Sequence, residues 1–213
     1  MRRTPRDNWE IFARIARRYD LLNRILSFGQ EQNWREAGAA HLPPGRVLDL
    51  GSGTGAALPV LAGRLVVGLD PVAPMLYLSP IRSRVVAIGE QLPFKDGSFD
   101  GVFSAYVLRN LSSVDRTLAE IHRVLRPGGV AAIIDLARPQ RFWPRLLHRL
   151  GSAVVLPMAG LAVGAPGEYW YLHRSLDKLP PPETLLSHSA LTLDTTWRMG
   201  PLGFVYGALL SKS

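Results

Sequence analysis

The stretch that decides the fold is RVLDLGSGTG, residues 46–55, an apolar run that leads directly into a turn with three glycines. The apolar run is typical of a buried strand, and a glycine turn lets the backbone pass close to a bound molecule. Outward from this stretch, further strands are predicted at 64–69, 84–88, 99–104 and 129–135, with helices from about 54, at 72–79 and at 113–125. Strands that alternate with helices indicate βαβ units, and therefore a parallel sheet covered by helices on both faces.

Two longer segments flank this alternating core. Apolar residues at helical spacing predict one helix over 9–26 and a second over 31–40. After residue 138 the alternation stops for about 50 residues, and two β-like runs at 191–198 and 202–210 close the chain. The length of 213 residues fits one domain with a sizeable core.

Composition excludes several kinds of chemistry. The chain has no cysteine, so disulfides, cysteine-ligated zinc and thiol catalysis are excluded. Its five histidines show no metal-ligand spacing, and we expect no metal. Residues 1–12 lack the apolar core of a signal peptide, and the apolar window 152–165 is shorter than the roughly 20 residues that span a bilayer. These features predict a cytoplasmic protein.

The chain is strongly basic, with 25 Lys and Arg against 17 Asp and Glu and a formal net charge of +8. This balance favours an anionic partner, either nucleic acid or a membrane surface, unless the arginines only solvate the surface. The sequence shows no appended RNA-binding module and no Asn/Asp-Pro-Pro-aromatic motif of base methylation. We therefore expect no nucleic-acid partner.

An amphipathic pattern at 137–150 supports the membrane alternative. One helical face carries Arg138, Arg141, Arg145, His148 and Arg149, and aromatic and leucine side chains fall on another. Such a helix can lie in the interface of an anionic bilayer, peripherally at the inner face of the membrane. The alternative is that its apolar face docks on the domain itself or on a second subunit in a homodimer.

The charge around the glycine turn distinguishes between two kinds of cofactor. Gly51, Gly53 and Ala56 fit the dinucleotide fingerprint, and Asp70 follows at the distance expected for a ribose contact. A diphosphate, however, prefers backbone N–H groups with no anion nearby, and Asp49 stands at the strand tip. S-adenosylmethionine (SAM) has no phosphate and carries an ammonium and a sulfonium group, which a carboxylate attracts. Asp49 would face its amino-acid end and Asp70 its ribose hydroxyls, unless both carboxylates only cap the following helices.

Several longer segments resemble one enzyme family. They are YDLLNRILSFGQEQNWR at 19–35, VLDLGSGTG at 47–55, GLDPVAPML at 68–76, EQLPFKDGSFD at 90–100, LRNLSSVDRTLAEIHRVLRPGG at 108–129 and YWYLHRSLDKLPPPETL at 169–185. In these segments the chain resembles the menaquinone/ubiquinone biosynthesis C-methyltransferases, which use SAM to methylate a ring carbon of a prenylated quinol. The resemblance implies an α/β fold of the Rossmann-like class I methyltransferase type, a mostly parallel seven-stranded sheet with an antiparallel C-terminal strand. Within one domain over 1–213, residues 1–42 would form a helical lid and residues 138–188 a helical cap over the substrate pocket.

The resemblance also implies further cofactor contacts, from Thr54, Pro71, Gly89, Glu90, Ser104 and Ala105. Two sites depart from the family pattern. The family tends to carry Asp or Asn for the adenine amino group where this chain has Ile88, so backbone groups around Gly89 and Glu90 would hold the adenine. Glu31 and Gln32 replace a usual His-Arg pair.

The resemblance places the chemistry at Arg109 and Asn110, just after the strand 99–104. A phenol with a pKa of about 10 is mostly protonated at pH 7, and an adjacent cation lowers such a pKa by about 1–3 units. Arg109 would therefore stabilise the quinolate oxygen, and Asn110 would hydrogen-bond the ring or a water. The alternative is that Arg109 forms a structural ion pair with Asp20 or Asp115.

Substrate contacts and the proton acceptor are expected in the segments that would roof the pocket, with Tyr19, Tyr169 and His173 as candidates. Two other functions stay open. Many class I methyltransferases share the cofactor motif, so the acceptor could be another small molecule. Alternatively, the chain is a SAM-binding scaffold without quinol turnover, an alternative that the changes at Ile88 and at Glu31-Gln32 favour.

Overall fold

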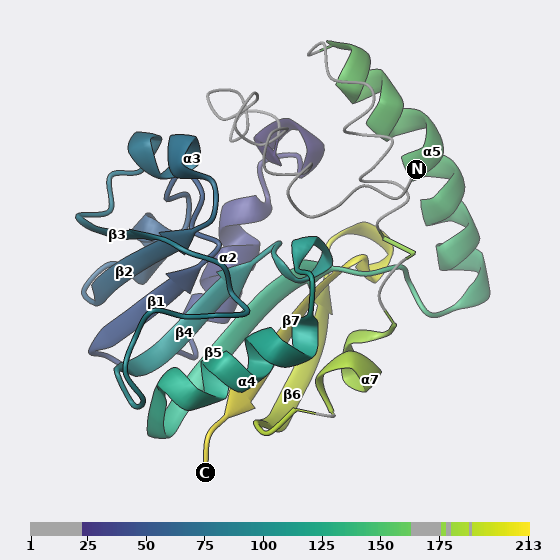
Figure 1. The fold of residues 1–213 in the computed structure, drawn as a ribbon. Coiled ribbons are helices and arrows are strands. Elements are labelled where there is room, and N and C mark those ends of the chain that lie inside the picture. Colours follow the sequence, from purple (N-terminus) through teal and green to yellow (C-terminus); the bar gives the residue numbers. More distant parts are fainter. Residues whose placement is uncertain (1–22, 163–175, 178–179, 188) are drawn as a thin grey trace.

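The computed structural model describes residues 23–162, 176–177, 180–187 and 189–213 (Figure 1). Its centre is a seven-stranded sheet in the order β3-β2-β1-β4-β5-β7-β6. The strands are β1 (Arg46–Leu50), β2 (Leu65–Asp70), β3 (Ser83–Val86), β4 (Phe99–Ala105), β5 (Leu125–Leu136), β6 (Thr192–Met199) and β7 (Val205–Ser211). Strands β3, β2, β1, β4 and β5 pair in parallel, and β7 runs antiparallel to both β5 and β6. The predicted mostly parallel sheet with an antiparallel C-terminal strand is confirmed.

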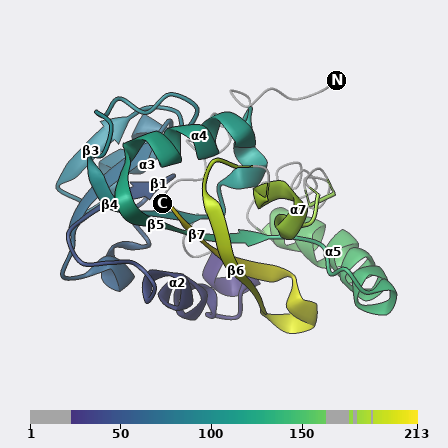
Figure 2. The same cartoon turned by 90° about the horizontal axis from the view of Figure 1, so that it is seen from below.

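Helices cover both faces of the sheet. The described helices are α2 (Glu31–Ala39), α3 (Ala73–Leu78), α4 (Val114–Val124), α5 (Phe142–Ala162) and α7 (Pro182–Leu186), with 3₁₀ turns η1 (Leu58–Leu61), η2 (Leu108–Asn110) and η3 (Pro201–Gly203). Seen from below, α4 lies on one face and α2 on the other (Figure 2). Each face has its own apolar core, because Leu118 and Ile121 of α4 belong to one buried cluster and Trp34 of α2 belongs to a second.

The observed bounds differ from the predicted ones in several places. The helix predicted from about residue 54 is only the turn η1, because the chain between Gly55 and β2 is short and contains Pro59. The run predicted at 202–210 begins instead at Val205, since Leu202 in η3 has a φ of 61° and cannot extend a strand. Strand β5 starts earlier than predicted, and its pairing with β4 shifts register between Phe99 and Gly101.

The long helix α5 leaves the end of β5 and extends away from the sheet (Figure 1). It begins after the start of the amphipathic segment 137–150, continues beyond its end and contains Pro157. In the described part of the chain, no helix has the length and apolar character needed to cross a membrane. Of the helix predicted over 9–26, only 23–26 lie in the described part, and these residues are helical.

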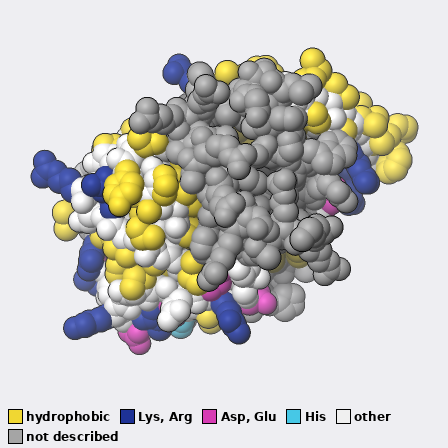
Figure 3. Space-filling model, turned by 45° about the horizontal axis from the view of Figure 1, so that its top comes forward, with side chains coloured by type: hydrophobic (Ala, Val, Ile, Leu, Met, Phe, Trp, Pro, Cys, Tyr) yellow, Lys and Arg dark blue, Asp and Glu magenta, His cyan; other side chains and the backbone are white. Residues whose placement is uncertain are grey.

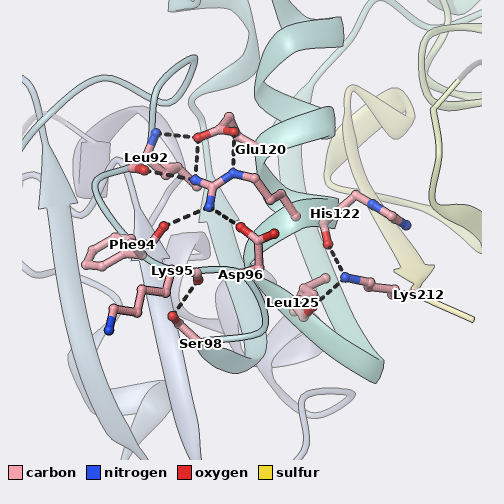
Figure 4. A network of polar contacts seen from close by, with 10 residues as sticks. Leu92, Phe94, Lys95, Asp96, Ser98, Glu120, His122, Leu125 and Lys212 are labelled. Carbon is pink, nitrogen blue, oxygen red and sulfur yellow. Dashed lines mark hydrogen bonds and ion pairs between the residues drawn. The ribbon is translucent and has the colours of Figure 1, made fainter.

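One arginine ties the loop before β4 to helix α4 (Figure 4). Arg123 donates hydrogen bonds to the carbonyl oxygens of Leu92 (2.9 Å) and Phe94 (2.7 Å), and it pairs with the Asp96 carboxylate at 2.8 Å. Glu120 completes the network, because its Oε1 accepts from the Arg123 Nε–H and its Oε2 from the Leu92 N–H. This network explains the EQLPFKDGSFD motif: it holds in place the loop whose start, at Glu90, borders the cavity described next.

Candidate active site

A cavity of about 480 Å³ opens at the carboxyl ends of β1, β2 and β4. Strand β1 lies between β2 and β4: the chain continues from β1 to β2 and β3 on one side, and after β3 it crosses over to β4 on the other side. Open α/β sheets bind ligands at such a switch point. All but one of the residues predicted for the cofactor line this cavity, namely Asp49, Gly51, Gly53, Thr54, Asp70, Pro71, Gly89, Glu90 and Ala105. The exception is Ser104, which is fully buried within β4 and is not among the lining residues.

Within the glycine turn, position 51 requires glycine for two separate reasons. Its φ of 72° lies in the left-handed region, which favours glycine. A Cβ at this position would lie 2.3 Å from Cγ2 of Val107, so the turn also has no room for a side chain. The Gly51 N–H donates to the Leu69 carbonyl oxygen at 2.7 Å, which ties the turn to the end of β2.

Asp70 holds the same turn through both of its oxygens. Its Oδ2 accepts a hydrogen bond from the Gly53 N–H at 2.9 Å, and its Oδ1 accepts from the Val72 N–H at 2.8 Å. This holding role differs from the expected helix cap, because α3 begins at Ala73 and its N-cap residue, Val72, has no side-chain cap hydrogen bond. It does not compete with ligand binding, because each carboxylate oxygen keeps a second lone pair that can accept from a hydroxyl group.

Asp49 brings a poorly solvated carboxyl group to the cavity. Burial raises its pKa to about 7, although the charge of Arg35 lowers it, while the nearby Asp70 raises it further. Burial likewise raises the pKa of Asp70 to about 6. In the described part of the chain, Oδ2 of Asp49 is buried and has no hydrogen-bond partner. A cationic ligand would satisfy this carboxylate, whereas a diphosphate would add negative charge beside it, so these residues fit SAM.

The part of the cavity wall around Gly89 combines an apolar side chain with closely packed backbone. Ile88 contributes a partly exposed side chain, and Gly89 is so closely packed that a Cβ would lie 3.1 Å from Cγ2 of Thr117. The Glu90 carboxylate accepts hydrogen bonds from the N–H groups of Ser112 (2.6 Å) and Ser113 (3.2 Å). Glu90 therefore orders the start of α4 and shapes the wall.

Arg109 and Asn110 are adjacent in η2 but line different cavities. Asn110 lines the cofactor cavity, whereas Arg109 lines a second, mostly apolar cavity of about 310 Å³. The Arg109 guanidinium forms an ion pair with Asp135 at 2.9 Å, in which Asp135 is fully buried and Arg109 is partly buried. The prediction that Arg109 pairs with Asp115 was therefore wrong. The other predicted partner, Asp20, lies outside the described residues. The ion pair does not remove Arg109 from the wall of the second cavity, where its side chain remains among the lining residues.

Tyr106 separates the two cavities and lines both. It is one of three described residues other than glycine with a positive φ, at 66°. Such strain concentrates at functional sites. Here a hydrogen bond from the Tyr106 N–H to the Ile134 carbonyl oxygen (2.7 Å) holds the backbone. The guanidinium carbon of Arg35 lies 5.3 Å from the centre of its ring.

The structure brings residues to the site that sequence reasoning did not select. Glu31 is buried, accepts a hydrogen bond from the Ser27 hydroxyl group and lines the apolar cavity. His148 also lines this cavity and stacks on Phe204, with ring centres 5.0 Å apart. Glu31 was visible in the sequence only as a departure from the family pattern. His148 gave no signal beyond its place in the amphipathic segment.

Three predicted substrate residues, Tyr19, Tyr169 and His173, lie outside the described part of the chain. Among the described residues, no group of three acidic or histidine side chains could hold a metal ion.

Comparison with known proteins gives matches over most of the chain. A methyltransferase-domain model matches residues 48–133, and the model of the ubiE/COQ5 methyltransferase family matches residues 4–76. Demethylmenaquinone methyltransferase of Thermus thermophilus is 38% identical over 193 residues, covering 82% of this chain and 87% of the relative. The enzyme of the same name from Roseiflexus castenholzii is 36% identical over 209 residues, covering 91% and 88%. Ubiquinone/menaquinone biosynthesis C-methyltransferase of Rubrivivax gelatinosus is 35% identical over 181 residues, covering 80% and 72%.

Solved structures share the fold at lower identity. A SAM-dependent methyltransferase from Thermotoga maritima superposes with a TM-score of 0.68 at 18% identity, covering 96% of this chain and 100% of that one. Phosphoethanolamine N-methyltransferase 2 of Haemonchus contortus, solved with SAM, gives a TM-score of 0.61 at 17% identity, covering 84% and 52%. The fold, the cavity and these matches define a class I, SAM-dependent methyltransferase. Within that class, the chain belongs to the ubiE/COQ5 methyltransferase family.

Proposed function

We propose that this enzyme transfers a methyl group from SAM to a ring carbon of a prenylated quinol of the demethylmenaquinol type. The observation that carries this proposal is the apolar cavity, which shares Tyr106 with the cofactor cavity and has the Arg109 guanidinium in its wall. An aromatic ring with a hydroxyl group matches such surroundings. The printed names of the relatives, which refer to demethylmenaquinone and to ubiquinone and menaquinone biosynthesis, support the same acceptor.

The bound cofactor supplies an electrophilic methyl group, and the protein's task is to position and polarise the acceptor. Each turnover replaces one ring C–H bond by a C–CH₃ bond and releases one proton. An aromatic carbon becomes a better nucleophile when a ring hydroxyl group ionises, which at pH 7 costs about 4 kcal/mol for a phenol with a pKa of about 10. Positioning in a dry cavity contributes more, about 7–11 kcal/mol in intramolecular models.

Arg109 is the group we assign to stabilising the ionised oxygen. It cannot accept the proton, because a guanidinium keeps its own proton in proteins. Asp135 holds it in place, since its carboxylate also accepts hydrogen bonds from the N–H groups of Leu108 and Leu136, both at 2.7 Å. Asn110, whose amide lies 3.4 Å from the Tyr106 carbonyl oxygen, is assigned to the ring or a bound water on the cofactor side.

The flanking segments fit the roles of lid and cap. From residues 1–42, the described side chains Asn23, Leu26, Phe28, Glu31 and Trp34 line the apolar cavity. From residues 138–188, the cavity is lined by Leu147, His148, Val155, Leu156 and Leu176. Both segments would then border the proposed acceptor.

The experiment that tests this function is incubation of the enzyme with isotopically labelled SAM and demethylmenaquinol. Mass spectrometry of the extracted quinol should show a gain of one labelled methyl group on carbon. A second arm offers a benzoquinol and a non-prenylated phenol. SAM binding without methyl transfer to any quinol would favour the scaffold alternative, and transfer only to the non-prenylated phenol would favour another small-molecule acceptor.

We also propose that the enzyme works in the cytoplasm in peripheral contact with an anionic membrane surface, through the outer face of α5. The side chains of Phe142, Trp143, Leu150 and Met158 are well exposed. Arg141, Arg145 and Arg149 are exposed beside them, and α5 contains no acidic residue. Figure 3 shows hydrophobic and basic side chains at the right-hand edge of the molecule, where α5 lies. This combination is complementary to anionic headgroups above an acyl layer, where a prenylated acceptor would reside.

Vesicle flotation tests the membrane contact. The triple variant Arg141→Gln, Arg145→Gln, Arg149→Gln should bind phosphatidylglycerol vesicles about 100-fold more weakly than the wild type, since each cation contributes about 1 kcal/mol. A control variant that neutralises the exposed Arg82, Lys95 and Arg116 should bind nearly as the wild type does. Equal weakening by both triple variants, or a wild-type dimer that buries α5 and ignores vesicles, would reject the contact.

A further inference from the structure

Arg35 is a buried cation at the cofactor cavity for which the described chain provides no ion-pair partner. It is the only Lys, Arg or His among the described residues that line this cavity, and its exposed fraction is 5%. Its Nη1 is buried without a hydrogen-bond partner in the described part of the chain. Its guanidinium lies against the Tyr106 ring, which fixes its place but satisfies no N–H group. A buried charge without a partner is costly and indicates that a bound group completes the site.

A second incomplete charge of opposite sign lines the same cavity. Oδ2 of Asp49 is also buried without a hydrogen-bond partner in the described residues. The two side chains are near enough for the Arg35 charge to lower the Asp49 pKa, yet no ion pair within 4.0 Å joins them. A separated cation and anion that both lack partners match a ligand that carries both charges. An α-amino acid group, with its ammonium and carboxylate on one carbon, is such a ligand.

We infer that Arg35 binds the α-carboxylate of the methionine part of the cofactor, while Asp49 accepts its ammonium group. The inference rests on the dependence on SAM and not on the identity of the methyl acceptor. It makes Arg35 a specificity residue: adenosyl sulfonium compounds that lack the carboxylate, such as decarboxylated SAM, leave the guanidinium unpaired and bind weakly. Arg35 lies on α2, and Glu31 and Trp34 of the same helix line the apolar cavity.

The test compares the binding of SAM and of decarboxylated SAM to the wild type and to Arg35→Met. Binding is measured by calorimetry in the absence of any acceptor. The full-length wild type should bind SAM about 30-fold more tightly than decarboxylated SAM, as expected for one charge-assisted hydrogen-bonded pair. Arg35→Met should bind the two ligands within about threefold of each other. Arg35→Lys should keep an intermediate preference, because it keeps the charge without the planar fork.

Two controls keep the outcome interpretable. 5′-Methylthioadenosine lacks the whole amino acid part of SAM and should bind to the wild type and to Arg35→Met with equal affinity. Equal affinity shows that the nucleoside-binding part of the site is intact in the variant. Arg46→Met removes an exposed arginine at the opposite end of β1 and should keep the 30-fold preference. An unchanged preference in Arg35→Met, or no preference in the wild type, would overturn the inference. Failure of quinol methylation would leave this result untouched, so the two proposals fail separately.

Discussion

Arg109→Met is expected to lower kcat for quinol methylation about 100-fold while changing the Kd for SAM by less than threefold. Loss of the guanidinium raises the pKa of the bound phenol by the 1–3 units that an adjacent cation provides, and the ionised fraction falls accordingly. SAM binding is spared because Arg109 lines the apolar cavity and is absent from the described lining of the cofactor cavity. Single-turnover kinetics and calorimetry measure the two quantities.

The ion pair with Asp135 requires a control for stability. Removing Arg109 leaves a buried carboxylate without its cation, at a cost of about 3 kcal/mol in the free energy of unfolding. The double variant Arg109→Met, Asp135→Asn removes both charges and should recover most of this stability, measured by urea unfolding, without recovering kcat. If the double variant regains both, or if Arg109→Met alone stays within a few-fold of wild-type turnover, the guanidinium is structural only.

Asp49→Asn is expected to weaken SAM binding about 100-fold at pH 8 and to abolish most of its pH dependence. In the free protein, burial raises the pKa of Asp49 from its ordinary value of 3.8 to about 7. A cationic ligand binds the ionised form, so wild-type affinity should rise with pH and level off above about 7. At pH 6 about one-tenth of the carboxyl groups are ionised, so the affinity should be about tenfold below its plateau.

Calorimetry in buffers of different ionisation enthalpy checks the sign, because SAM binding below pH 7 should release close to one proton. The same raised pKa means that the ligand-free fold loses stability as pH rises through 7 and that SAM restores it. Asp96→Asn, which changes an exposed carboxylate, should retain the wild-type affinity and pH profile. A wild-type affinity independent of pH between 5.5 and 8 would contradict the assignment of Asp49 to a cation.

Much of the cofactor cavity was predictable because it depends on short-range rules. Apolar runs of strand length and glycines after them indicate where parallel strands end, and those ends meet at one edge of the sheet. Asp49, Asp70 and the loop at Gly89 were therefore expected to converge, and they line one cavity. Ser104 is not among the lining residues, because it precedes the end of β4 by one residue and its side chain is buried in the packed core.

The sequence by itself determined the sheet, the glycine turn and the two carboxylates, because each follows from local periodicity or from the conformational demands of single residues. Only the tertiary structure decided which residues share a cavity across long separations. It paired Arg109 with Asp135, and it placed Arg35 of α2 in the lining of the cofactor cavity and Glu31 of the same helix in the lining of the apolar cavity. These placements depend on how α2 packs on the sheet and on the direction in which a single 3₁₀ turn aims two adjacent side chains. No pattern in the order of residues encodes either of them.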